Sequence, residues 1–229
     1  MPLNRRPEYT FLDNMNNGRH GWLRLTPAYS ARLVEDRLRG IPETISVLDP
    51  FGGSGTTALI ASYKGLNATT TELNPFLVWL AQAKTRFYTE QHMSETRTLA
   101  QYLLQQADSG SPEKASLPPI HDINRWWDRD SLRWLCAFRS LIMDLHAVEP
   151  PVVDLLKVAF ARCVIALSNA SYHHPSVSFR ENNQLQLSLV DYGALFSEHL
   201  EFVLCGAKYN PLRQAQVYRD DARTLASLP

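Results

Sequence analysis

The sequence contains few cysteines, and they are not grouped. Its three cysteines, Cys136, Cys163 and Cys205, lie far apart in the chain. An odd number without paired spacing offers neither a disulfide framework nor a zinc motif, and His173 and His174 have no third ligand nearby in the sequence. We therefore predict reduced thiols in a cytoplasmic protein, and no metal site.

A surplus of positive charge is also missing. The 23 Lys and Arg residues are balanced by 23 Asp and Glu residues, so the formal net charge is zero. A protein that holds nucleic-acid phosphates unaided is usually basic. If this chain contacts DNA, the DNA-binding surface is therefore local or lies on another polypeptide.

No long uninterrupted apolar run is present. The most apolar region, residues 152–167, contains Asp154, Lys157 and Arg162, which argues against a membrane span. Residues 1–9 are polar and have no apolar run after them, so no signal peptide is predicted. The 229 residues are enough for one large domain, or for one domain with an insertion.

A glycine-rich turn stands between a short apolar stretch and a helical stretch. Residues 45–57 read ISVLDPFGGSGTT, which predicts a buried, central parallel strand, a turn and then a helix. The glycines allow a ligand to approach the backbone closely. No Lys-Ser or Lys-Thr follows as in a P-loop, and the spacing is not the GxGxxG of a classical NAD site. For the glycines alone, a plain tight turn remains the alternative.

A second apolar and Thr-rich stretch, residues 66–71, ends in an acid, Glu72. The acid lies about 20 residues beyond Gly52, which is the separation at which dinucleotide-binding folds place a carboxylate on a ribose. The glycine turn and Glu72 together therefore predict a nucleoside-binding site more strongly than either does alone.

Asp49-Pro50-Phe51-Gly52-Gly53-Ser54-Gly55-Thr56-Thr57 closely resembles the DPFxGSGTT motif of DNA methyltransferases that modify exocyclic amino groups. Residues 72–76, ELNPF, look like the same family's second motif, whose acid holds the ribose hydroxyls of S-adenosylmethionine. Residues 26–30, TPAYS, resemble the family segment that lines the methionine end of the cofactor. A plain helix cap with an aromatic packed behind it is the alternative for this segment.

The end of the chain resembles the family's third motif, a strand followed by Gly-Asp-Ala, whose Asp contacts the adenine. Asp220 stands where the Gly is usual. The resemblance implies S-adenosylmethionine as the cofactor, with these binding residues: Thr26, Pro27, Tyr29, Ser30, Asp49, Pro50, Phe51, Gly52, Gly53, Ser54, Gly55, Thr56, Thr57, Glu72, Leu73, Asn74, Asp221 and Ala222.

The expected fold class is α/β: a partial Rossmann-like methyltransferase fold with a parallel sheet and a helical insertion between the second and third motifs. We expect an N-terminal arm and cofactor-binding part over 1–107, the helical insertion over 108–210 and a return strand over 211–229. Residues 107–119 read as a linker. The aromatics of the insertion favour a packed core, whereas the polar segment 168–183 is equally consistent with a loop and with contacts to phosphate or sugar.

The family's catalytic motif, Ser/Asp/Asn-Pro-Pro-Tyr/Phe, does not occur. Residues 149–152, EPPV, and 117–120, LPPI, contain two prolines but lack the aromatic, and they read as a helix start and a linker. In this fold the catalytic strand pairs with the strand at 45–48, which without it is an open edge. We therefore expect no catalytic residue in this chain and no activity by this chain alone. A second polypeptide, or a missing C-terminal part, would complete the enzyme.

The leading hypothesis is the S-adenosylmethionine-binding part of a site-specific DNA methyltransferase, of the restriction-modification type, with cytosine N(4) favoured over adenine N(6). Its expected partners are DNA and the second polypeptide, with no membrane. A non-catalytic S-adenosylmethionine-binding or scaffold subunit is the alternative. An unrelated small-molecule methyltransferase is disfavoured by the two motifs at 49–57 and 72–76.

Overall fold

Two compact units make up the chain. The computed structural model describes residues 9–15, 17–25, 29–109, 117–171, 178–179 and 191–228. One unit comprises Met1–Glu90 with Cys205–Pro229, and the other comprises Gln91–Leu204. These bounds differ from the expected ones because helix α5 (Glu90–Ser109) groups with the second unit. The linker-like composition at 107–119 therefore follows the first helix of that unit instead of preceding it.

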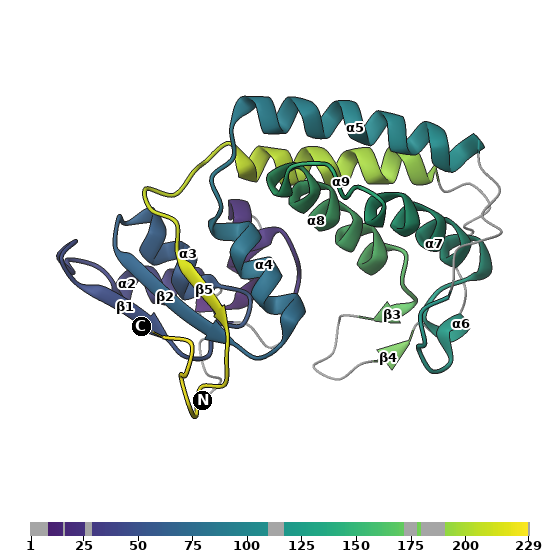
Figure 1. The fold of residues 1–229 in the computed structure, drawn as a ribbon. Helices are drawn as coiled ribbons and strands as arrows, with labels where there is room; N and C mark the ends of the chain where they lie inside the picture. Colours follow the sequence, from purple (N-terminus) through teal and green to yellow (C-terminus); the bar gives the residue numbers. More distant parts are fainter. Residues whose placement is uncertain are drawn as a thin grey trace. The chain divides into compact units, whose positions relative to one another are not determined.

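The first unit contains a parallel, three-stranded sheet. Strands β1 (Ser46–Asp49), β2 (Asn67–Glu72) and β5 (Gln216–Arg219) lie in the order β1-β2-β5 (Figure 1). Asp49 is paired with Thr70, and Glu72 is paired with Arg219. The fold class is therefore mixed α/β with a parallel sheet. Because the strands run in one direction, the segments that follow them all lie at the carboxyl end of the sheet.

Two helices pack on the same face of this sheet. Helix α3 (Thr56–Tyr63) connects β1 to β2 and helix α4 (Pro75–Thr85) follows β2; they contact each other as well as the strands. Small residues allow this close packing, and the core below α3 consists of Ala58, Ala61, Leu66, Ala68 and Ala215.

Strand β1 differs from its expected place as a buried central strand. In the sheet that the described residues form, it is an edge strand whose residues are alternately exposed and half-buried. Val47 packs into the core, whereas Leu48 on the opposite face is 49% exposed and Ile45 just before the strand is 48% exposed. The apolar composition was read correctly, but burial requires a neighbouring strand on each side, and among the described residues β1 has one on its β2 side only.

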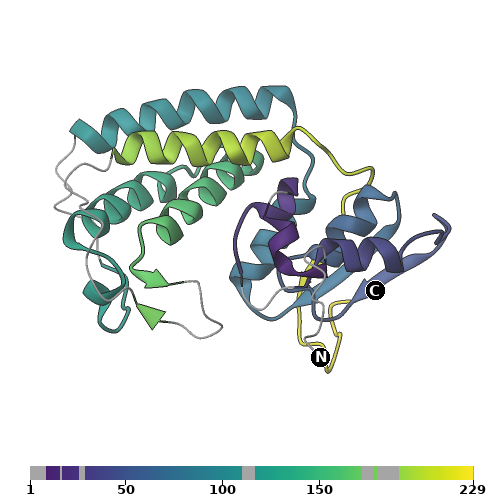
Figure 2. The ribbon, with the colours of Figure 1, turned by 180° about the vertical axis from the view of Figure 1, so that it is seen from behind.

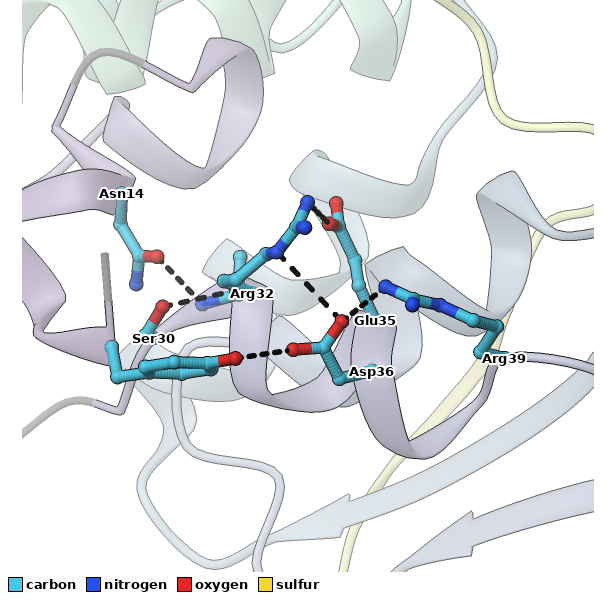
Figure 3. Close-up of polar contacts among 8 residues, drawn as sticks. Asn14, Ser30, Arg32, Glu35, Asp36 and Arg39 are labelled. Carbon is cyan, nitrogen blue, oxygen red and sulfur yellow. Dashed lines mark hydrogen bonds and ion pairs between the residues drawn. The ribbon is translucent and has the colours of Figure 1, made fainter. Parts of the chain in front are cut away.

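The N-terminal segment, residues 9–15 and 17–25, is joined through Asn14 to the start of helix α2 (Ala31–Arg37), as Figure 3 shows. The Asn14 side chain accepts from the Ala31 backbone N–H at 2.7 Å and donates to the Tyr29 carbonyl at 2.9 Å. Ser30 caps the helix by accepting from the Arg32 N–H at 3.1 Å, as its position before the helix predicted. The expected N-terminal arm contains two short helices, α1 (Phe11–Asn14) and η2 (Gly18–Gly21).

The exposed side of α2 bears a small charge network. Asp36 accepts from the Tyr9 hydroxyl at 2.8 Å and pairs with Arg39 and Arg32 (Figure 3). Because solvent screens exposed ion pairs, this network adds little stability. The two Asn14 hydrogen bonds, which are shielded, do more to fix the N-terminal segment beside the helix.

A buried guanidinium joins three parts of the first unit. Arg19, in η2, is fully buried and donates to the carbonyls of Lys84 and Arg86 at the end of α4, at 2.9 and 2.6 Å. It also donates to the carbonyls of Gly206 and Ala207 and to the Asn210 side chain. With all of these acceptors, Arg19 has the hydrogen-bond partners that a buried charge needs.

The second unit is helical, as expected. Its helices are α5, α6 (Ile123–Trp126), α7 (Arg129–Met143), α8 (Pro150–Ala166) and most of α9 (Tyr192–Ala207), with a short antiparallel pair, β3 (Ala170–Ser171) and β4 (Ser178–Phe179). Helices α5 and α9 lie side by side in Figures 1 and 2, joined by an Arg97–Glu201 ion pair at 2.7 Å. The chain turns from α8 through 168–171, and the rest of the polar segment apart from Ser178 and Phe179 lies outside the described residues.

Aromatic residues form the centre of the second unit. Phe138 packs against Trp134 and Phe196, with ring centroids 5.0 and 4.6 Å apart. This confirms that the aromatics around Phe138 form core. In the part of the chain that is described, no helix combines the length and apolarity needed to cross a bilayer.

We expect Gly55→Ala to destabilise the first unit more than Gly53→Ala. A Cβ at Gly55 would lie 2.8 Å from the Ala81 Cβ, and both glycines have positive φ, +79° and +50°. The left-handed backbone costs each variant roughly 1 to 2 kcal/mol, and overpacking adds roughly 1 to 3 kcal/mol at Gly55 alone. Urea denaturation measures the difference; equal losses would contradict the close approach of α3 to α4.

Candidate functional site

The glycine loop is held against the end of β2. The Gly52 N–H donates to the Thr71 carbonyl at 2.9 Å, and the Thr71 hydroxyl donates to the Pro50 carbonyl at 3.0 Å. The Thr70 hydroxyl donates to the Asp49 carbonyl at 2.9 Å. A Cβ at Gly52 would lie 2.0 Å from that hydroxyl oxygen, so the loop needs glycine there to approach β2.

Glu72 points at this loop. One carboxylate oxygen accepts from the Gly53 N–H at 2.9 Å and the other accepts from the Asn74 N–H at 2.8 Å. An ionised carboxylate has about four acceptor sites, so two remain for hydroxyl groups of a ligand. The structure thus brings together the acid and the glycines that sequence reasoning paired; their role in binding stays a prediction.

The segment after β5 also lies at the carboxyl end of the sheet, beside the end of β2. The Asp220 N–H donates to the Glu72 carbonyl at 3.2 Å. The Asp220 carboxylate accepts from the backbone N–H groups of Asp221 and Ser227, at 2.7 and 2.6 Å, and so shapes the turn. Sequence reasoning treated Asp220 only as a departure from Gly; the signal was an Asp opening a turn, where Asx hydrogen bonds are common.

Asp221 lies in this turn with its carboxylate already paired. It accepts from the Arg223 guanidinium through both oxygens, the shortest contact being 2.5 Å. The Arg223 hydrogen bonds hold the pKa of Asp221 at about 2. Ala222, beside it, is half-buried. An adenine amino group would therefore have to share Asp221 with Arg223, or use the turn backbone.

The upstream candidates divide into three groups. Thr26 and Pro27 lie outside the described residues. Ser30 is buried and is used as the cap of α2. Tyr29 does reach the loop: its hydroxyl lies 2.6 Å from the Thr57 hydroxyl and donates to Asp49 at 3.3 Å. Burial raises the pKa of Tyr29, so the phenol stays protonated at neutral pH.

Some of the candidates have local structural tasks. Asn74 caps α4 by accepting from the Phe76 N–H at 2.9 Å, and Asp49 accepts from the Phe51 N–H at 3.0 Å in a turn. Thr56 is buried at the start of α3. Leu73 and Phe51, in contrast, are 63% and 76% exposed. Exposed apolar side chains beside a glycine loop offer a surface on which a flat ring can pack.

Sequence reasoning did not find the small pocket beside the loop. Asn14, His20 and Arg24 of the N-terminal segment and Ser54 of the loop are among its lining residues, and its volume is about 10 Å³. Burial, followed by the charge of Lys84, lowers the pKa of His20 to about 3. These residues are distant in the sequence and share no motif, so only the folded chain brings them together.

This end of the sheet has the kinds of groups that a nucleoside-like ligand requires. It combines an acid for ribose hydroxyls, a glycine loop with room for close approach and exposed apolar side chains for a ring. Within the described residues, no group of three His, Cys, Asp or Glu side chains is placed to hold a metal ion.

The chain shows a limited similarity to one kind of known protein. A stretch of 64 residues is 36% identical to the type II methyltransferase M.BsoBI of Geobacillus stearothermophilus. The stretch covers 27% of this chain and 13% of that protein. No protein-family model matches the chain, and no solved structure matches it. The similarity supports a relationship to methyltransferases.

We expect His20 to make the folded chain sensitive to acid. Folded His20 has a pKa of about 3 against an ordinary value of 6.5, so between these values only the unfolded state takes up its proton. The free energy of unfolding should therefore fall, as pH is lowered through this window, by about 1.4 kcal/mol per pH unit more than in His20→Gln.

Urea denaturation at pH 7, 5.5 and 4.5 measures this difference. His146→Gln, a change at an exposed histidine, is the control and should follow the wild-type curve. If His20→Gln also lost stability as steeply as the wild type, the imidazole would not be buried in its neutral form.

Proposed function

We propose that this chain binds S-adenosylmethionine and is the cofactor-binding part of a site-specific DNA methyltransferase that acts on an exocyclic amino group. Cytosine N(4) is favoured over adenine N(6). The observation that carries the proposal is the hydrogen bond of the Glu72 carboxylate, which accepts from the Gly53 N–H at 2.9 Å. It lies at the carboxyl ends of β1 and β2. The similarity to a type II methyltransferase supports the same class of protein.

The proposed arrangement follows from the chemistry of each side chain. The remaining acceptor sites of Glu72 receive the two ribose hydroxyls. The adenine packs near Leu73, with the turn at Asp221 and Ala222 at its polar edge. The sulfonium lies near the glycine loop, where Asp49 supplies a negative charge.

We further propose that the catalytic strand comes from a second polypeptide, which pairs with β1. Strand β1 is at the edge of the sheet that the described residues form, with Ile45 and Leu48 about half exposed. An apolar edge strand is a template for another strand. Of the two double prolines, Pro150 and Pro151 open α8 and Pro118 and Pro119 lie in the second unit, so neither follows a strand of the parallel sheet.

The competing function is a non-catalytic S-adenosylmethionine-binding or scaffold subunit. The double prolines favour it too, because neither of them follows a strand of the parallel sheet and a scaffold needs no group that contacts a flipped base. The two functions differ in whether a complex with the second polypeptide transfers a methyl group to DNA.

We expect Glu72→Ala to weaken S-adenosylmethionine binding strongly. Two charge-assisted hydrogen bonds to ribose are lost, each worth roughly 1.5 to 3 kcal/mol. The loss of each bond should therefore lower the affinity about tenfold or more. Isothermal titration calorimetry measures the change. Glu72→Gln tests the charge alone, and Glu43→Ala, at an exposed acid of the same unit, is the control. Unchanged affinity in Glu72→Ala would refute the proposed site.

We expect Leu48→Lys to abolish association with the second polypeptide without unfolding the chain. Leu48 is half exposed, so the free energy of unfolding should change by no more than about 0.5 kcal/mol. The measurement is co-purification with the polypeptide encoded by a neighbouring reading frame, followed by methyl transfer from labelled S-adenosylmethionine to DNA. Leu212→Lys, at another exposed leucine of the first unit, is the control. Methyl transfer by the isolated chain would contradict the proposal that a second polypeptide supplies the catalytic strand.

A further inference from the structure

The second unit contains a groove between α5 and the segment that leads into α8. Leu99 and Tyr102 of α5 line it together with Val148 and Val152, and its volume is about 480 Å³. Natural binding sites have volumes of roughly 300 to 1,000 Å³. All of the lining residues belong to the second unit, so the groove is separate from the candidate cofactor site in the first unit.

The lining of this groove is largely apolar. Leu99, Val148 and Val152 supply aliphatic groups, and Tyr102 is 55% exposed. The Thr98 hydroxyl, also in the lining, donates to the Ser94 carbonyl at 3.2 Å, so its hydrogen bond is made within α5. An exposed aromatic side chain beside aliphatic groups is typical of an anchor point in a protein–protein interface.

The charges around the groove are negative. Glu95 lines it, and no Lys or Arg is among the described residues that do so. Glu149, next to Val148 in the chain, has a side chain that is 69% exposed. Residues 91–204 contain nine Lys and Arg against thirteen Asp and Glu, a formal charge of −4. A surface of this sign repels nucleic-acid phosphates and attracts a basic protein segment.

The wall that α5 provides favours a helix as the occupant. The groove follows α5 from Ser94 to Tyr102, which is about 12 Å along the helix axis. The backbone groups of a helix interior are hydrogen-bonded within the helix, so this wall has no free strand edge for an extended peptide. An amphipathic helix satisfies its own backbone groups and can lay its apolar side into such a groove.

Strand β1 by itself offers too little surface for a stable complex. It has four residues, and a strand of that length spans about 13 Å. A stable protein–protein interface buries roughly 800 Å² on each partner. Pairing along one short strand covers a small part of that area, so the second polypeptide needs a further contact on this chain.

We propose that the groove binds a basic amphipathic helix of the second polypeptide, whose apolar side packs on Leu99, Tyr102 and Val148 and whose Lys or Arg side chains lie beside Glu95. This inference rests on the proposed function and assigns a second contact surface to the partner that the function requires. Strand pairing at β1 and helix docking on the second unit would then both be needed for a stable complex.

The affinity of the whole chain for the polypeptide encoded by a neighbouring reading frame tests this by calorimetry, in NaCl at about 50 mM and about 300 mM. We expect Tyr102→Ala to weaken the complex about tenfold or more at both salt concentrations, because an apolar anchor is lost. Glu95→Lys should weaken it about tenfold at the lower salt concentration and by less at the higher one, because salt screens the charge.

Two matched variants are the controls. Glu198→Lys makes the same change of charge at an exposed acid of α9, and Gln101→Ala changes an exposed position of α5; neither residue lines the groove. Both should bind the polypeptide as the wild type does. Glu95 and Tyr102 are exposed, so their variants should keep the wild-type urea midpoint and the wild-type affinity for S-adenosylmethionine.

The outcomes separate this proposal from the proposed function. A wild-type complex whose affinity is unchanged in Tyr102→Ala and Glu95→Lys would overturn the docking groove and leave the proposed function intact. Tighter binding by Glu95→Lys would overturn the basic helix. If sedimentation showed the isolated chain to be a dimer that Tyr102→Ala dissociates, the groove would belong to a second copy instead. Failure of the wild-type chain to bind the polypeptide would refute both the second polypeptide and its helix, while S-adenosylmethionine binding would still support the cofactor site.

Discussion

The parallel pairing of β1 with β2 is the constraint on which the candidate site depends. It places the loop after β1 against the end of β2, where Glu72 accepts from the Gly53 N–H. The hydroxyls of Thr70 and Thr71 hold the carbonyls of Asp49 and Pro50 in the same place. The loop is thus shaped by side chains of a neighbouring strand as much as by its own glycines. Helix α4 completes the arrangement, because Gly55 allows it to approach α3 closely.

The buried polar groups of the first unit differ in their hydrogen-bond partners. Arg19 makes all its hydrogen bonds within the chain and joins the N-terminal segment to the ends of α4 and α9. His20 is nearly as deeply buried, yet neither of its ring nitrogens has a hydrogen-bond partner among the described residues. Burying a polar group without a partner costs free energy, so the Arg19 hydrogen bonds stabilise the first unit whereas the buried His20 imidazole does not.

The sheet also explains why we assign cofactor binding to this chain and catalysis to a second polypeptide. Strands β1, β2 and β5 carry the three segments that resemble cofactor motifs, and all three segments meet at one edge. The second unit contributes an aromatic core around Phe138. The free side of β1 is where a further strand would bring a catalytic group next to the glycine loop.

Local patterns in the sequence were sufficient for the strand, turn and helix around the glycines and for the pairing of this turn with Glu72. The glycine turn, the acid at Glu72 and the cap Ser30 follow from chemistry within a few residues, and Ser30 makes the hydrogen bond that its position predicted. The helical character of the second unit was also predicted.

Tertiary structure alone placed β1 at an edge, assigned α5 to the second unit and brought Asn14, His20 and Ser54 together around the pocket. A strand's burial and a side chain's partners depend on segments far away in the chain, and no local spacing encodes them. The hydrogen bonds of caps and turns depend on neighbouring residues, whereas the burial of a side chain and its distant partners are decided only when the chain folds.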